Sequence, residues 1–135
     1  MQYYKVVRME QGRLWSACAR DELQCEYVPG QWTTAPVGGL LVFRAKKDAE
    51  RWVSECCAGA EYMMQIWSAD CEDPVPLPWI GLGYPWLKKI AEHVWSKGMP
   101  PERIEGWVRY GPILDADWPA GTLAFRKVKL VSKVR

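Results

Sequence analysis

Residues 40–56 read LLVFRAKKDAERWVSEC, and they combine the pattern of a strand with the pattern of a helix. The apolar run 40–43 has the length and branching that are typical of a buried strand. From Lys46 the period changes, and apolar side chains recur at helical spacing, at Ala49, Trp52, Val53 and Cys56. Charged residues occupy the other face, so the pattern predicts an amphipathic helix that begins at Lys46 and is ended by Gly59.

The residues before this stretch are expected to form strands. Two strand patterns, 3–9 and 13–19, flank a turn-sized gap that contains Gly12, the residue type that a hairpin bend favours. A third strand is expected over 24–28, because a Pro-Gly pair follows it directly. The N-terminal part of the chain therefore predicts a hairpin and one further strand.

Beyond the helix the sequence predicts a strand over 61–68 and then a long loop. The stretch 70–85 contains four Pro, two Gly and three carboxylates, a composition typical of an ordered loop with polyproline character. A second helix is expected over 86–97, a short strand over 107–110 and a last strand over 122–134.

These elements predict an α+β domain with a mixed or antiparallel sheet of about five to six strands and two packed helices. The 135 residues have the length of one domain, which we expect to span 1–135. No apolar run approaches the roughly 20 residues that a spanning helix needs, and the first residues lack the pattern of a secretory signal. We therefore expect a cytoplasmic protein that does not enter a membrane.

Charge is unevenly placed beneath a net charge of +2. The tail 126–135 carries five basic and no acidic groups, which could form a phosphate-binding face or an edge strand whose lysines prevent edge-to-edge association. The rest of the chain is not basic, unlike a dedicated nucleic-acid binder. Nucleic acid is therefore an unlikely partner, and exposed aromatic rings beside the lysines would be needed to support it.

The residue types of common catalytic and metal sites are scarce. The five cysteines have no C-x-x-C spacing, so neither a disulfide framework nor a zinc site is indicated. His93 is the only histidine, and no phosphate-binding loop or nucleophile motif is present. We therefore predict no metal and no cofactor, and a non-catalytic protein is the favoured interpretation.

Tryptophan is the unusual component, with nine Trp against two Phe. A domain of this size cannot bury nine indoles with an acceptor for each N–H, so some are expected at a groove or interface. They gather with Tyr around two loops, and an arginine lies within possible reach of them. The predicted ligand- or partner-binding residues are Trp79, Tyr84, Trp86, Arg109, Tyr110 and Trp118.

The first half of the chain resembles small uncharacterised domains encoded in prokaryotic and phage genomes. The shared order is YKVV at 4–7, Ser-Ala at 16–17, Y-x-x-G at 27–30, a glycine-led strand at 39–43 and an alanine-bearing helix from Asp48. This resemblance implies a protein encoded by a phage or mobile element.

The same order is distantly similar to the small ADP-ribosyltransferase fold. Members of that family use an Arg or His on an early strand, a Ser-bearing strand and a late Glu. The resemblance implies an alternative catalytic set of Arg8, Ser16 and Glu26, although the glutamate comes before the strand–helix unit that it should follow.

The sequence therefore supports three functional hypotheses. The leading hypothesis is a non-catalytic binding protein that engages a protein or a nucleotide-like ligand through its Trp-rich loops. The alternatives are an ADP-ribosyltransferase-like enzyme and a structural or assembly subunit that forms a homo-oligomer through exposed Trp residues.

Overall fold

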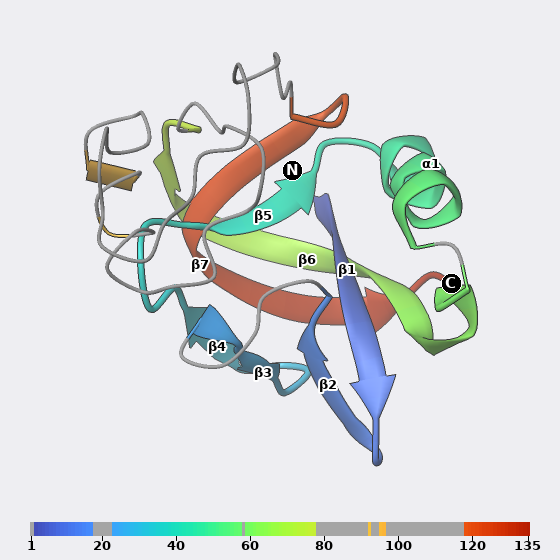
Figure 1. Ribbon diagram of the computed structural model, residues 1–135. Helices are drawn as coiled ribbons and strands as arrows, with labels where there is room; N and C mark the ends of the chain where they lie inside the picture. Colours follow the sequence, from blue (N-terminus) through green and yellow to red (C-terminus); the bar gives the residue numbers. More distant parts are fainter. Residues whose placement is uncertain (1, 18–22, 58, 78–91, 93–94, 97–117) are drawn as a thin grey trace, which may run out of the picture.

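A computed structural model of the protein describes residues 2–17, 23–57, 59–77, 92, 95–96 and 118–135. Figure 1 shows its strands wrapped around a common interior, with one helix at the side. In chain order the elements are β1 (Tyr3–Glu10), β2 (Arg13–Ser16), β3 (Glu26–Tyr27), β4 (Trp32–Thr34), β5 (Leu40–Phe43), α1 (Lys46–Cys56), the 3-10 helix η2 (Glu61–Met63), β6 (Met64–Val75) and β7 (Thr122–Lys133).

The prediction of an α+β domain with two packed helices and five to six strands is wrong. Seven strands hold 49% of the described residues, and α1 is the one α-helix among the described elements. The pairs β1–β5, β5–β7, β7–β6 and β6–β1 are all antiparallel and form a closed four-stranded barrel. A sheet that closes on itself covers its own inner face, so it needs no second helix layer.

Several predicted elements have the expected positions. β1 and β2 form the predicted hairpin, and both turn residues, Gln11 and Gly12, have positive φ angles of 53° and 75°. This is the backbone that a tight hairpin turn requires. α1 begins at Lys46, and Gly59 follows its end with a φ of 85°. The predicted helix 86–97 lies outside the described residues except at 92 and 95–96, and the predicted strand 107–110 lies wholly outside them.

The expected loop 70–85 is a strand over its first six residues. β6 continues to Val75, and Pro74 lies opposite Phe125 of β7. Beyond Ala69 the described partner of β6 is β7 alone, and proline is tolerated at such a strand edge. Asp73 has a φ of 58°, so the strand bends just before the proline. Residues 78–85 lie outside the described residues.

Two separate cores stabilise the fold. The barrel interior contains the first, built around Val7, Tyr27, Val42, Val128 and Leu130. The second lies between α1 and the outer surface of the barrel, where Ala49 and Val53 pack on Val6, Phe43 and Ile66. Alternate residues of β1 thus serve different cores, since successive side chains of a strand point to opposite faces.

β1 changes its partner along one edge. Along this edge β1 pairs with β5 at a single position, Tyr4 opposite Phe43, and then with β2 from Val7 opposite Ser16 onward. The opposite edge of β1 pairs with β6 from Tyr3 to Arg8. The barrel wall is therefore interrupted between β5 and β2, beside Lys5 and Val6.

Candidate functional site

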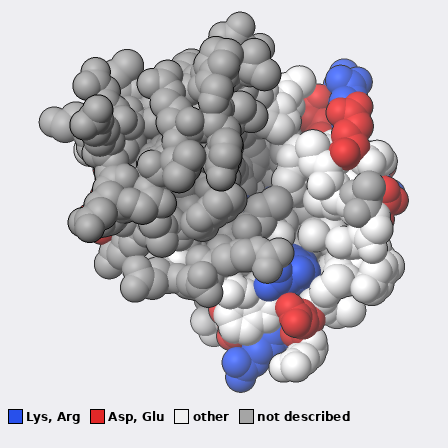
Figure 2. Space-filling model, viewed as in Figure 1, with Lys and Arg blue, Asp and Glu red and all other residues white. Residues whose placement is uncertain are grey.

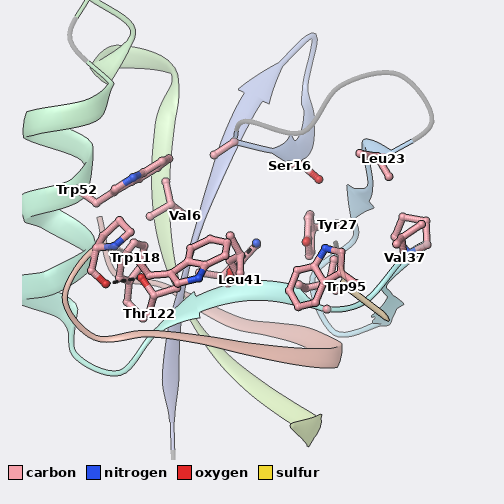
Figure 3. A pocket seen from close by; sticks show the side chains of 17 residues that line it. Val6, Ser16, Leu23, Tyr27, Val37, Leu41, Trp52, Trp95, Trp118 and Thr122 are labelled. Carbon is pink, nitrogen blue, oxygen red and sulfur yellow. Dashed lines mark hydrogen bonds between the residues drawn. The ribbon is translucent and has the colours of Figure 1, made fainter. Parts of the chain in front are cut away.

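A cavity of about 290 Å³ lies at this interruption of the barrel wall. Its described walls come from β1, β2, β3, β5, α1 and the residues that precede β7. Figure 3 shows Trp52 at the helix end of the cavity and Tyr27 with Trp95 at the opposite end. The site is therefore built where four strands and the helix meet, and it opens beside the barrel core.

Three indoles from separate parts of the chain line the cavity. Trp52 stands on α1, one position before the buried Val53, and its ring centroid is 6.0 Å from that of Phe43. Trp95 lies directly against Gly38, which has a φ of 61° and no room for a β-carbon on that side. Trp118 completes the set. The walls are consequently flat, apolar and aromatic.

Backbone hydrogen bonds hold the segment that carries Trp118. The carbonyl of Pro119 accepts hydrogen bonds from the backbone N–H and the hydroxyl of Thr122, which closes a turn directly after the indole. The carbonyl of Gly121 accepts a hydrogen bond of 2.8 Å from the N–H of Arg44, between β5 and α1. This turn ties the start of β7 to the helix side of the cavity.

Lys5 is the one charged side chain among the described lining residues. It is only 7% exposed, its Nζ donates a 2.7 Å hydrogen bond to the carbonyl of Leu41, and it lies 5.2 Å from the centre of the Tyr27 ring. Tyr3, Lys5 and Val7 alternate along β1, so the lysine occupies a position on the inward-facing row of the barrel. Its ammonium bridges β1 to β5 next to their single ladder pair.

The charge of Lys5 acts on two thiols, those of the buried Cys25 and the partly exposed Cys71. Burial raises the pKa of Cys25, while the nearby positive charge of Lys5 and a hydrogen bond with Ser16 partly oppose that rise. Burial raises the pKa of Cys71 to about 12, with Lys5 lowering it and Asp70 raising it further. Desolvation dominates at both sulfurs, so both are held as neutral thiols at neutral pH.

The alternative catalytic residues are not assembled into one site. Arg8 is opposite Trp15, and Trp15 is opposite Glu26, so Arg8 and Glu26 share one face of the sheet. Ser16 follows Trp15 directly and therefore points to the other face, where it lines the cavity.

Each of these three residues also has a local partner. Arg8 pairs with Glu10 at 3.3 Å, and Glu26 pairs with Arg13 at 3.9 Å. The Ser16 hydroxyl accepts a 2.9 Å hydrogen bond from the N–H of Cys25. The first of these contacts lies within β1, and the other two join β2 to the segment that forms β3.

Among the six binding residues expected from sequence, Trp118 lies in the cavity wall. Trp79, Tyr84, Trp86, Arg109 and Tyr110 lie outside the described residues. Sequence reasoning missed three lining residues, Lys5, Trp52 and Trp95. The sequence does contain a signal for Lys5 as a lining residue, because it interrupts the otherwise apolar row of alternate side chains Tyr3, Val7 and Met9 on β1.

The basic tail lies beside acidic groups on β6. Lys129 is opposite Asp70, with 3.8 Å between Nζ and a carboxylate oxygen, and Lys127 is opposite Glu72. Trp32, 41% exposed, stacks its ring 5.0 Å from the Nζ of Lys129. An exposed ring does lie beside the lysines, but the adjacent carboxylates offset their charge. On the described part of the face in Figure 2, blue and red atoms adjoin without a large patch of one sign.

The described part of the chain contains no group of three or more His, Cys, Asp or Glu side chains that could hold a metal ion. None of the helices in the described ranges has the length and apolar composition needed to cross a membrane.

Comparisons with protein-family models, curated proteins and solved structures found no match to this chain. The resemblances noted for its first half therefore stay predictions.

Proposed function

We propose that the protein is a non-catalytic binding protein and that its ligand occupies the Trp-lined cavity. The observation that carries this proposal is the cavity of about 290 Å³, walled by Trp52, Trp95 and Trp118 around the buried ammonium of Lys5. Ligand sites are typically concave and mostly apolar, with a few placed polar groups, and this cavity has that composition.

The position of the cavity also supports the proposal. Protein interiors are normally close-packed, and an opening of this size loses the contacts that its walls would otherwise make. Here the opening arises because β1 leaves β5 after one ladder pair, so the wall is interrupted by the strand topology itself. A ligand with an aromatic ring would restore the missing contacts by packing against the indoles.

Tryptophan fluorescence and thermal melting test the proposal directly. The full chain would be titrated with NAD, mononucleotides, cyclic nucleotides, short oligonucleotides and free aromatic compounds. We expect a saturable change in emission together with a higher melting temperature for at least one compound, because a ligand stabilises the state that it binds. A flat response across the panel contradicts a small-ligand site and directs the search to protein partners.

Matched variants locate the binding site. Trp118→Ala removes one wall of the cavity, whereas Trp32→Ala removes an exposed indole on β4 that does not line it. We expect the first variant to lose binding and the second to retain it, with both still folded by circular dichroism. Equal binding by Trp118→Ala and the unaltered protein would place the ligand elsewhere.

A further inference from the structure

The polar side chains of the cavity wall support an inference about the charge of the ligand, which rests on the proposed function. We infer that the cavity accepts an uncharged, flat aromatic molecule of one or two rings and discriminates against ligands that carry a charge. Nucleotides are charged through their phosphate groups, so this assignment separates the ligand from them.

The volume of the cavity limits the size of the ligand. An apolar cavity of about 150 Å³ is large enough for one benzene molecule. The cavity of about 290 Å³ is roughly twice as large, so it has room for two fused rings or for one ring with a short substituent. A complete dinucleotide is too large to enter it.

The walls favour an aromatic ring over an aliphatic group. Trp52 and Trp95 stand at opposite ends of the cavity (Figure 3), and Trp118 also lines it. Phe43, whose ring centroid is 6.0 Å from that of Trp52, extends the aromatic surface at the helix end. Aromatic pairs in offset or edge-to-face arrangements gain more than the buried area alone provides. A flat ring therefore gains contacts that an aliphatic group of the same size does not.

Lys5, the one charged side chain among the described lining residues, is engaged by the protein itself. Its Nζ donates a 2.7 Å hydrogen bond to the carbonyl of Leu41 and lies 5.2 Å from the centre of the Tyr27 ring. A ligand carboxylate would compete with these partners, and drawing the ammonium away would deprive the carbonyl of Leu41 of its donor. The lysine therefore links β1 to β5 and β3, and this role does not select an acid.

The two hydroxyls of the wall also have partners in the backbone. The Ser16 hydroxyl accepts a hydrogen bond from the N–H of Cys25, and the Thr122 hydroxyl donates to the carbonyl of Pro119. Burial raises the pKa of Cys25, so the surroundings of Ser16 already disfavour a charged group. A charged ligand would lose its hydration on entering such a cavity, whereas an uncharged ring has little hydration to lose.

Four probes with the same ring test the inference: indole, uncharged indole-3-ethanol, anionic indole-3-acetate and cationic tryptamine. The last three have side chains of similar size, so they differ mainly in charge. Calorimetry with the full chain at pH 7 would give the dissociation constants. We expect indole-3-ethanol to bind at least about tenfold more tightly than either charged probe, because only the charged probes give up strongly held water. Indole should also bind more tightly than both.

A matched pair of variants tests the preference for an aromatic ring. Trp52→Leu keeps an apolar side chain but removes an indole from the wall, whereas Trp32→Leu removes an indole that does not line the cavity. We expect Trp52→Leu to weaken the binding of indole-3-ethanol about threefold to tenfold and Trp32→Leu to leave it unchanged. Equal affinities would overturn this preference. If Trp52→Leu does not fold, phenol and cyclohexanol on the unaltered chain decide the point, since phenol should bind more tightly.

The outcomes separate this inference from the proposed function. If indole-3-acetate or tryptamine binds as tightly as indole-3-ethanol, the inference is overturned and the cavity remains a binding site. Saturable binding of a mononucleotide that Trp118→Ala abolishes has the same meaning. If the four probes and the wider panel all fail to bind, the proposed function fails together with the inference.

Discussion

The two pairings that close the barrel differ greatly in length. β6 and β7 pair from Trp67 opposite Lys133 to Val75 opposite Ala124, whereas β1 and β5 pair only at Tyr4 opposite Phe43. Along the long pairing the enclosed side chains are packed, and beside the short pairing the wall opens into the cavity. The continuous side of this barrel is closely packed, whereas the interrupted side holds the cavity in which we propose that a ligand binds.

Truncating one side chain on each side of the barrel should reveal the difference in packing most clearly. Leu130 of β7 is 1% exposed, while Leu41 of β5 lines the cavity and is only half-buried. We expect Leu130→Ala to lower the free energy of unfolding by about 3 kcal/mol and Leu41→Ala by about 1 kcal/mol. Urea denaturation checks both values. Equal losses would mean that the two sides are packed alike.

Substitutions at two glycines test the contact that Trp95 makes with Gly38. Gly38 and Gly30 both have positive φ angles, of 61° and 83°, but a β-carbon at Gly38 would overlap the Trp95 indole, whereas none would be met at Gly30. We expect Gly38→Ala to cost about 2 kcal/mol and Gly30→Ala about 1 kcal/mol.

Fluorescence would show whether the indole moves. Only Gly38→Ala should shift the tryptophan emission to longer wavelength, because the altered backbone would push Trp95 away from the cavity wall. Identical costs and identical spectra for the two variants would disprove this contact.

The pH dependence of stability tests how well the long pairing excludes water. Burial raises the pKa of Cys71 to about 12, against 9.0 for an ordinary thiol. Above pH 9 the unfolded chain therefore loses this proton while the folded chain keeps it, so stability falls as pH rises from about 9 to 12.

Denaturation of the unaltered protein and of Cys71→Ala at pH 8 and pH 10 would measure this effect. The unaltered chain should lose more stability than the variant over that interval, by less than about 1 kcal/mol because Cys71 is partly exposed to solvent. Cys56→Ala serves as the control because Cys56 is exposed. A control that behaves like Cys71→Ala would show that the thiol of Cys71 is not the cause.

The smallest effect is expected on the outer surface of the long pairing. Asp70→Asn removes the ion pair with Lys129, whose two side chains are both partly exposed. Exposed pairs contribute little, so we expect a loss below about 0.5 kcal/mol that vanishes in 1 M salt. A loss above 1 kcal/mol in thermal or urea denaturation would show that β6 and β7 depend on their surface charges.

Local patterns predicted individual elements well and their assembly badly. The helix from Lys46, the strand 40–43 and the hairpin around Gly12 follow from periodicity and turn chemistry, which depend on near neighbours. β6 was expected to end at Ser68 because prolines follow it. Its continuation depends on β7, which lies far away in the sequence, and no local pattern contains that partner.

The candidate site shows the same division. The excess of tryptophan predicts an aromatic-walled groove, and Trp118, one of the six predicted residues, lines the cavity. Trp52 and Trp95 fall within the two predicted helices, and neither is among the predicted binding residues. Whether such a residue fills a core or lines a cavity depends on the space that the surrounding strands leave.

Local sequence patterns were enough to predict where the helix and several strands begin and which of their faces are apolar. Only the tertiary structure shows that the sheet closes into a barrel, that β1 and β5 share a single ladder pair, and that Lys5 lines the resulting opening. The physical reason is range: periodicity and turns are set by residues a few positions apart, whereas closure and cavities arise from contacts between distant strands.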